Sequence, residues 1–120
     1  MVKGNHDILS KAWYTKANIE VINDHLMIEE FYFTHDMSDC KDTPGCYVFS
    51  GHVHPSITIK GLGRQALQLP CFYFAKDHAI LPAFGKFTGN FPVKSNKGTD
   101  VYAIMPANAS KGEKGGVIKV

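Results

Sequence analysis

From residue 19 onward, the apolar residues of the chain fall into short runs that polar or turn-forming residues separate. Runs of this length, rich in β-branched and aromatic residues, are typical of β-strands. Before them, the stretch SKAWYTKAN predicts a single helix, with Ser10 as its N-cap and Asn18 at its end. The pattern predicts strands near Ile19–Ile22, Leu26–Ile28, Phe31–Thr34, Tyr47–Ser50, Ile57–Lys60, Leu67–Phe74, Val101–Met105 and Val117–Val120.

Several local features refine this strand-rich picture. Pro55 has no N–H to donate and is expected to end strand pairing. The pair Gly61 and Gly63 favours a hairpin turn. The aromatic run Phe72–Phe74 is interpreted as core, and LPAFGKFTG (residues 81–89) as a buried loop at the sheet edge. His25 and His78 lie in predicted turns and are expected at the surface.

Composition indicates a soluble globular protein. The 120 residues are enough to bury a core, and 44% hydrophobic and 20% charged residues are ordinary values. Three cysteines fit a reducing cytoplasm better than a secreted scaffold, and the spacing of Cys40 and Cys46 matches no common zinc pattern. No apolar run is long enough for a membrane span. We therefore expect a cytoplasmic protein with no membrane contact.

Charge is unevenly distributed although the net charge is only +2. Residues 1–50 carry four lysines against eight acids, whereas residues 85–120 carry six lysines against two acids. An acidic first part suits cations and a basic last part suits phosphates. Oppositely charged solvated faces explain the same distribution equally well, so charge alone does not indicate nucleic acid.

Three polar clusters carry the candidate chemistry: GNHD at residues 4–7, FTHD at 33–36 and SGHVH at 50–54. Each follows an apolar run, the first of them only the short Met1–Lys3. Residues just past the ends of strands gather in one crevice in α/β architectures. Four of the six histidines lie in these clusters, which favours a functional site.

The spacing of His52 and His54 allows three interpretations. In extended backbone, residues i and i+2 project to the same side, about 6–7 Å apart. Such a pair can converge on one metal through bonds of about 2.0–2.1 Å, or serve two metals about 3.5–4 Å apart. It can also be a pair of hydrogen-bonded turn residues. Gly51 would let the backbone approach the site closely.

These motifs together give a family resemblance. GNHD, a histidine at a strand end in THD, and then GHVH resemble the last three ordered motifs of the calcineurin-like metallophosphoesterases. GLGRQALQLPCFYF followed by LPAFGKFTG looks like the bacterial ligase-associated DNA damage response endonucleases. The resemblance covers residues 3–105. It implies an α/β fold, the C-terminal half of a four-layer αββα sandwich that is strand-rich in this chain.

The resemblance also implies roles for individual residues. Asn5, His35 and His52 would bind one metal and His54 the other. His6 would stabilise the transition state or protonate the leaving oxygen, and Asp7 would orient His6. Two divalent ions are implied, with manganese first and iron or zinc as alternatives. Arg64 is a candidate contact to a substrate phosphate, or to a carboxylate.

Two motifs of the family are missing. D-x-H and G-D-x-x-D normally precede GNHD and supply most ligands of the first metal, and residues 1–120 contain neither. We therefore expect a partial metallophosphoesterase domain. The implied activity is phosphoester hydrolysis, as a phosphodiesterase or endonuclease acting on DNA in a system that includes a DNA ligase. The alternatives are a non-catalytic fragment binding a single metal, an inactive remnant, and a homodimer that covers the open sheet face.

Overall fold

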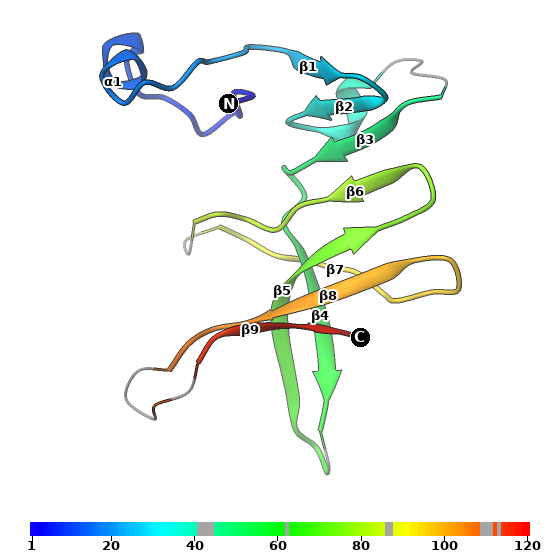
Figure 1. Cartoon of the computed structure of the whole chain (residues 1–120). Coiled ribbons are helices and arrows are strands. Elements are labelled where there is room, and N and C mark those ends of the chain that lie inside the picture. Colours follow the sequence, from blue (N-terminus) through cyan, green and yellow to red (C-terminus); the bar gives the residue numbers. More distant parts are fainter. Residues whose placement is uncertain (41–44, 62, 86–87, 109–111, 113) are drawn as a thin grey trace.

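The computed structural model describes residues 1–40, 45–61, 63–85, 88–108, 112 and 114–120. One short helix precedes a series of strands (Figure 1). The elements are α1 (Lys11–Lys16), β1 (His25–Ile28), β2 (Phe31–Thr34), the 3₁₀ turn η1 (Met37–Asp39), β3 (Tyr47–Ser50), β4 (Pro55–Lys60), β5 (Ala66–Phe74), β6 (His78–Ile80), β7 (Phe91–Pro92), β8 (Asp100–Met105) and β9 (Gly116–Lys119). The predicted strand-rich α/β class is confirmed.

The strands of the described residues form one mixed sheet. Along it the order is β1-β2-β3-β6-β5, with β8 and then β9 next to β5, while β4 pairs with β5 and β7. Strands β2, β3 and β6 are mutually parallel, and β1, β5, β8 and β9 add antiparallel pairs. The carboxyl ends of β2 and β3 therefore lie together, on the side of the sheet where the N-terminal segment and α1 stand (Figure 1).

Most predicted elements are confirmed, including the hairpin turn between β4 and β5, where Gly63 has a φ of +78°. The strand predicted at Ile19–Ile22 is wrong: only Ile22 pairs, in an isolated bridge with Val2. Pro55 was expected to end pairing but begins β4, opposite Phe91 of β7. A first-residue proline is tolerated because the ladder uses the carbonyl of His54, which accepts from Phe91 N at 3.0 Å.

The core is formed by side chains of β4, β5 and β8. Cys71, Val101 and Ala103 are fully buried, and Leu69 and Ile57 pack with them. Because side chains alternate along a strand, Tyr73 packs against this core while its neighbours Phe72 and Phe74 project to the opposite face. The interpretation of Phe72–Phe74 as core is thus correct only for Tyr73.

Strand register gathers aromatic side chains on the face opposite the core. Ring pairs connect β2 to β3, and β5 to β8. The rings are Phe31, Phe33, Tyr47, Phe49, Phe72, Phe74 and Tyr102, and all of them are half-exposed. We refer to this surface as the aromatic face. The segment predicted as a buried loop is also open in its described part, residues 81–85, 88 and 89, where Phe84 is fully exposed.

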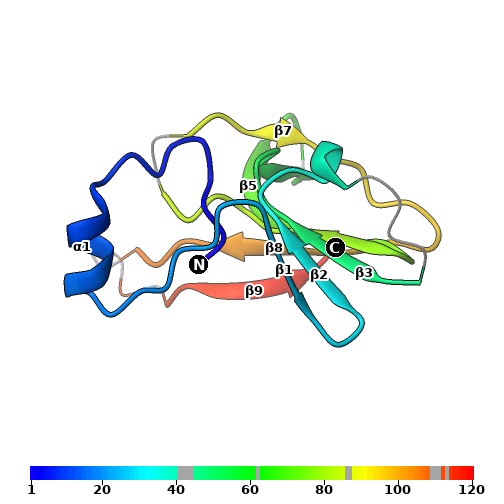
Figure 2. The same cartoon turned by 90° about the horizontal axis from the view of Figure 1, so that it is seen from above.

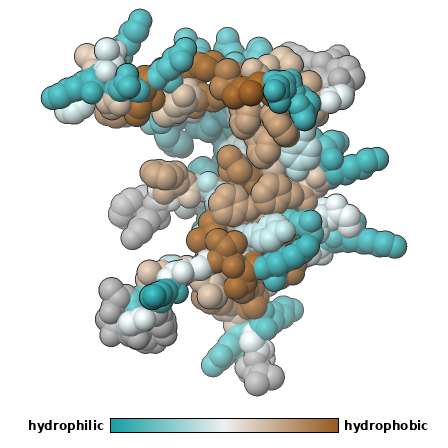
Figure 3. Space-filling model, viewed as in Figure 1, coloured by the Kyte–Doolittle hydropathy of each residue, from teal (hydrophilic) through white to brown (hydrophobic). Residues whose placement is uncertain are grey.

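The molecule is a slab and not a sphere. Its extents are 48 × 37 × 22 Å and its radius of gyration is 16.5 Å, whereas a compact chain of this length has about 14 Å. Helix α1 stands beyond the strand ends and covers neither face of the sheet centre (Figure 2). Apolar side chains are correspondingly visible across the middle of the molecule (Figure 3). In the described part of the chain, no helix has the length and apolarity that crossing a membrane requires.

Candidate metal-binding site at the ends of two parallel strands

Three segments meet where β2 and β3 end: the turn at residues 4–7, His35 and Asp36 after β2, and residues 51–54 after β3. Parallel pairing of Phe33 with Phe49 brings the two strand ends side by side. Lys3 N donates to the Ile22 carbonyl at 2.8 Å and holds the N-terminal segment beside them. The structure thus brings residues of the three polar clusters together.

Three donor atoms converge at this point. Asn5 Oδ1 lies 2.8 Å from His35 Nε2, and His52 Nδ1 lies 3.0 Å from the same nitrogen. A neutral imidazole has a single N–H, so His35 Nε2 cannot give each neighbour its own proton. Ligands at right angles around an ion, with bonds of about 2.1 Å, have donor atoms about 3.0 Å apart. Both observed distances, from Asn5 Oδ1 and from His52 Nδ1 to His35 Nε2, therefore fit adjacent ligands of one cation.

This ligand set depends on an amide oxygen. The described residues contain no group of three His, Cys, Asp or Glu side chains able to hold a metal. Asn5 supplies the third donor beside His35 and His52. Burial lowers the pKa of His35, and repulsion from His52 lowers it further, although nearby carboxylates act in the opposite direction. Burial thus favours the neutral imidazole that ligation requires.

The turn after β3 differs from the extended backbone that the sequence suggested for the two histidines. His52 has a φ of +27° and His54 a φ of +54°, both in the left-handed region that L residues rarely adopt. Such backbone costs on the order of 1–3 kcal/mol per residue and is concentrated at functional sites. The two side chains do not converge: His52 faces His35, whereas His54 Nδ1 lies 3.1 Å from the Gly89 carbonyl.

The contact of His54 fixes its ring. A carbonyl oxygen only accepts, so His54 Nδ1 must donate to it, and Nε2 then carries the lone pair. Histidine ligands of metals are commonly held in this way through the other ring nitrogen. His54 can therefore serve a cation other than the one that Asn5, His35 and His52 would bind.

The turn at residues 4–7 has a steric function. A Cβ on Gly4 would lie 2.8 Å from both Cε1 and Nδ1 of His35, so only glycine allows this approach. Gly4 N donates to Asp7 Oδ2 at 2.7 Å, which closes the turn. The His6 side chain is exposed and makes no hydrogen bond to any described residue, although the His6 carbonyl accepts from Ile8 N at 3.0 Å. Asp7 is thus engaged with the backbone, and its predicted action on His6 stays a prediction.

Asp36 is a member of the site that the sequence reasoning overlooked. Its Oδ2 lies 3.5 Å from His52 Nε2, and its Oδ1 accepts from Ser38 N at 2.9 Å. The hydrogen bond from Ser38 lowers the pKa of Asp36, and the nearby histidines lower it further. Its position immediately after the strand-end His35 was the only signal in the sequence.

Arg64 is not brought to the cluster. It is exposed in the turn at the tip of the β4–β5 hairpin, and the six residues of β4 separate that tip from His54. At about 3.3 Å per residue, this strand spans about 20 Å. Its role as a phosphate contact stays a prediction that this conformation does not favour.

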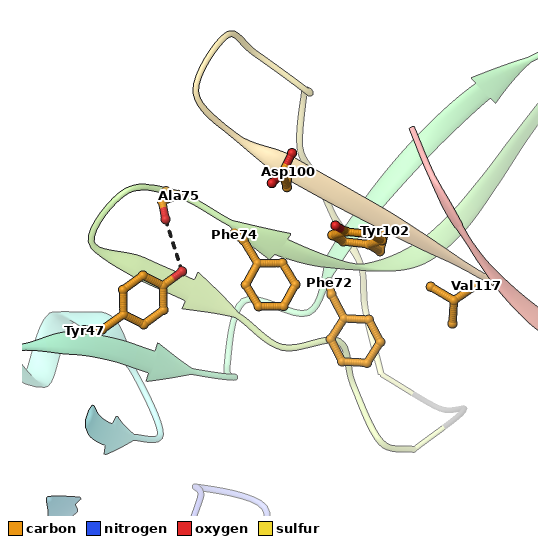
Figure 4. Close-up of a pocket in the computed structure, with 7 residues that line it drawn as sticks. All are labelled: Tyr47, Phe72, Phe74, Ala75, Asp100, Tyr102 and Val117. Carbon is orange, nitrogen blue, oxygen red and sulfur yellow. Dashed lines mark hydrogen bonds between the residues drawn. The ribbon is translucent and has the colours of Figure 1, made fainter. Parts of the chain in front are cut away.

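Two hollows differ in their relation to the site. One of about 310 Å³ lies directly beside His35 and is lined by Lys3, Asn23, Asp24, His25, Tyr32, Thr34, His35 and Asp39. Another, of about 640 Å³, lies on the aromatic face, where Phe72, Phe74 and Tyr102 line it together with Tyr47 and Val117 (Figure 4). None of the residues lining the second hollow belongs to the histidine cluster.

The chain is similar to a nuclease of known structure. The crystal structure of Pseudomonas putida nuclease MPE matches it with 30% sequence identity and a TM-score of 0.65, over 85% of this chain. The match covers 48% of the nuclease, so this chain spans about half of that protein's length. No family model and no curated protein matches the sequence. The strand-rich α/β fold is thus shared with about half of a nuclease.

Proposed function

We propose that this chain is the metal-binding part of a metallophosphoesterase, a metal-dependent hydrolase that acts as a phosphodiesterase or endonuclease on DNA. The observation that carries the proposal is the convergence of Asn5 Oδ1, His35 Nε2 and His52 Nδ1 at distances of 2.8 and 3.0 Å. The order of the three motifs and the similarity to nuclease MPE support it. Residues 1–120 then correspond to a partial domain, about half of a four-layer sandwich.

The roles of the side chains follow from their donor atoms. Asn5, His35 and His52 would hold one divalent ion, and His54 would contribute Nε2 to a second. Oxygen and nitrogen donors without thiolate suit manganese, with iron or zinc as alternatives. When bound, such ions polarise phosphoryl oxygens and lower the pKa of water. The exposed His6 side chain, which makes no hydrogen bond to a described residue, would protonate a leaving oxygen.

A second candidate, a single-metal-binding protein without turnover, is favoured by the imbalance between the two ion positions. Three donors converge on one position, while His54 alone points to the other. An inactive remnant would share this imbalance. The two candidates differ in stoichiometry and turnover, and both can be measured.

The test is titration of the purified chain with Mn²⁺ by calorimetry, together with hydrolysis of bis-p-nitrophenyl phosphate and of single-stranded DNA. Hydrolysis that requires Mn²⁺ would support the enzyme, and one tight ion without hydrolysis would support the second candidate. His52→Ala should abolish Mn²⁺ binding. His78→Gln, a histidine change outside the cluster, is the matched control and should bind like wild type. Unchanged Mn²⁺ binding by His52→Ala would refute the ligand assignment.

Three further assignments belong to the same proposal. A functional association with a DNA ligase system rests on the resemblance of residues 61–89 to the ligase-associated group. A cytoplasmic location rests on the low cysteine count. The aromatic face is the surface against which the other half of a four-layer sandwich, or a second copy, would pack.

A further inference from the structure

We propose that Asp36 is a positioning residue, whose carboxylate fixes the tautomer and the ring orientation of His52. This inference rests on the proposed function, because the His52 nitrogen that it sets free is the one assigned to the metal. Asp36 faces Nε2 of His52, and not the Nδ1 that is assigned to the metal. Its effect passes through the imidazole ring.

Hydrogen bonds to neighbouring residues fix the position of the Asp36 carboxylate. Asp36 is the N-cap residue of η1, and its Oδ1 accepts from Ser38 N at 2.9 Å. Its backbone carbonyl accepts from Thr34 Oγ1 at 3.2 Å. With one oxygen and the carbonyl engaged, the remaining Oδ2 is directed at His52 Nε2, 3.5 Å away.

The backbone around His52 fixes the orientation of its imidazole ring. Gly51 N donates to the His35 carbonyl at 3.1 Å, and the left-handed φ of His52 turns its ring toward the end of β2. His52 Nδ1 then faces His35 Nε2, and His52 Nε2 faces Asp36. The ring therefore spans the distance between the carboxylate and the other metal donors.

The chemistry of the two partners decides where the proton lies. An ionised carboxylate only accepts hydrogen bonds, so it favours the proton on Nε2. A neutral His52 protonated on Nε2 has its lone pair on Nδ1, the atom that faces the proposed ion position. A carboxylate behind a ligating histidine is a common outer-shell device and also makes the ligand more basic.

The substitution that isolates this effect is Asp36→Asn. An asparagine retains N-cap capacity for η1 but removes the anionic oxygen that faces His52. Asp39→Asn is the matched control, because Asp39 lies in the same 3₁₀ turn and has no hydrogen bond or ion pair to His52 among the described residues. Asp36→Ser is a second variant that keeps a capping side chain too short to reach the ring.

Two readouts are needed. Calorimetric titration with Mn²⁺ should give a Kd raised about 10–100-fold in Asp36→Asn and Asp36→Ser, and within about threefold of wild type in Asp39→Asn. Nitrogen-15 NMR of the imidazoles in the metal-free chain should show His52 protonated on Nε2 in wild type and in Asp39→Asn. Both Asp36 variants should lose this single-tautomer state.

The outcomes separate the inference from the proposed function. If His52→Ala abolishes binding while both Asp36 variants bind normally and keep the tautomer, Asp36 is only a helix cap and the inference is overturned. If His52→Ala still binds Mn²⁺, the metal assignment fails, and the tautomer in the metal-free chain alone then decides for or against Asp36. If Asp36→Asn does not fold, Asp36→Ser provides the same two readouts.

Discussion

Replacing Gly4 by alanine should weaken metal binding through a steric clash with His35. The new Cβ would lie 2.8 Å from both Cε1 and Nδ1 of the His35 ring. Real Cβ atoms essentially never lie closer than 3.0 Å to such an atom, and ordinary contacts begin at 3.4 Å, so the ring would have to move by a few tenths of an ångström. Gly4 is not among the glycines with positive φ, so the backbone itself accepts alanine. The perturbation is thus a displacement of one ligand.

The size of the effect follows from where the strain falls. Overpacking typically costs about 1–3 kcal/mol. Without metal, the ring can swing away and relieve most of this cost. In the bound state, Nε2 must keep its spacing to Asn5 and His52, so the cost appears in binding. At 1.4 kcal/mol per factor of ten, the Kd for Mn²⁺ should rise about 5- to 150-fold.

The assay is calorimetric titration of Gly4→Ala with Mn²⁺, with thermal melting of the metal-free chain beside it. Gly116→Ala is the matched control, because a Cβ at that position meets nothing within 4 Å. The control should bind like wild type, and Gly4→Ala should melt within a few degrees of it. Binding by Gly4→Ala within twofold of wild type would show that the His35 ring position does not matter for the ion.

Two other predictions concern β5. Leu69→Ala should lower the free energy of unfolding by about 2–5 kcal/mol in urea titration, because Leu69 is 4% exposed and packs in the core. Leu67 lies on the same strand but is 58% exposed, so Leu67→Ala should change this free energy by less than about 0.5 kcal/mol. Equal losses in the two variants would contradict the core assignment. Burial raises the pKa of the Cys71 thiol to about 11, so at pH 8 only about a thousandth of it is the reactive thiolate. Iodoacetamide should therefore modify half-buried Cys46 before Cys71 in the folded chain, and both in urea; early modification of Cys71 would refute its burial.

Local patterns predicted the elements whose partners are close in sequence. β1 and β2 form a hairpin with adjacent apolar runs, and β4 and β5 turn at a glycine pair. Two short strands were missed. β7 has two residues and pairs with the distant β4, and β6 has three residues that pair with the distant β3 as well as with the neighbouring β5. The apolar run at residues 19–22 was predicted as a strand but forms none. Among the described residues, its β-pairing is limited to one isolated bridge with Val2.

The candidate site, like the fold, was predictable from the sequence only in part. Motif order indicated that Asn5, His35 and His52 belong together, and their distances agree with this. Two features could not be read from sequence. Asp36 reaches His52 across sixteen residues only because η1 turns its carboxylate back, and no spacing rule predicts left-handed backbone at two consecutive motif histidines.

If the proposed metal site is correct, that left-handed turn bears on how many ions the described residues would hold. An extended His-x-His pair would direct both rings to one side, and the two could share an ion. With φ of +27° at His52 and +54° at His54, the rings separate, one toward the end of β2 and the other toward Gly89. The backbone strain of roughly 1–3 kcal/mol per residue would be relieved by a plain turn. The strained turn has a function if the two rings serve two neighbouring ions. Asn5 and His35 would complete the site of one ion, and ligands other than the described residues would complete the site of the other.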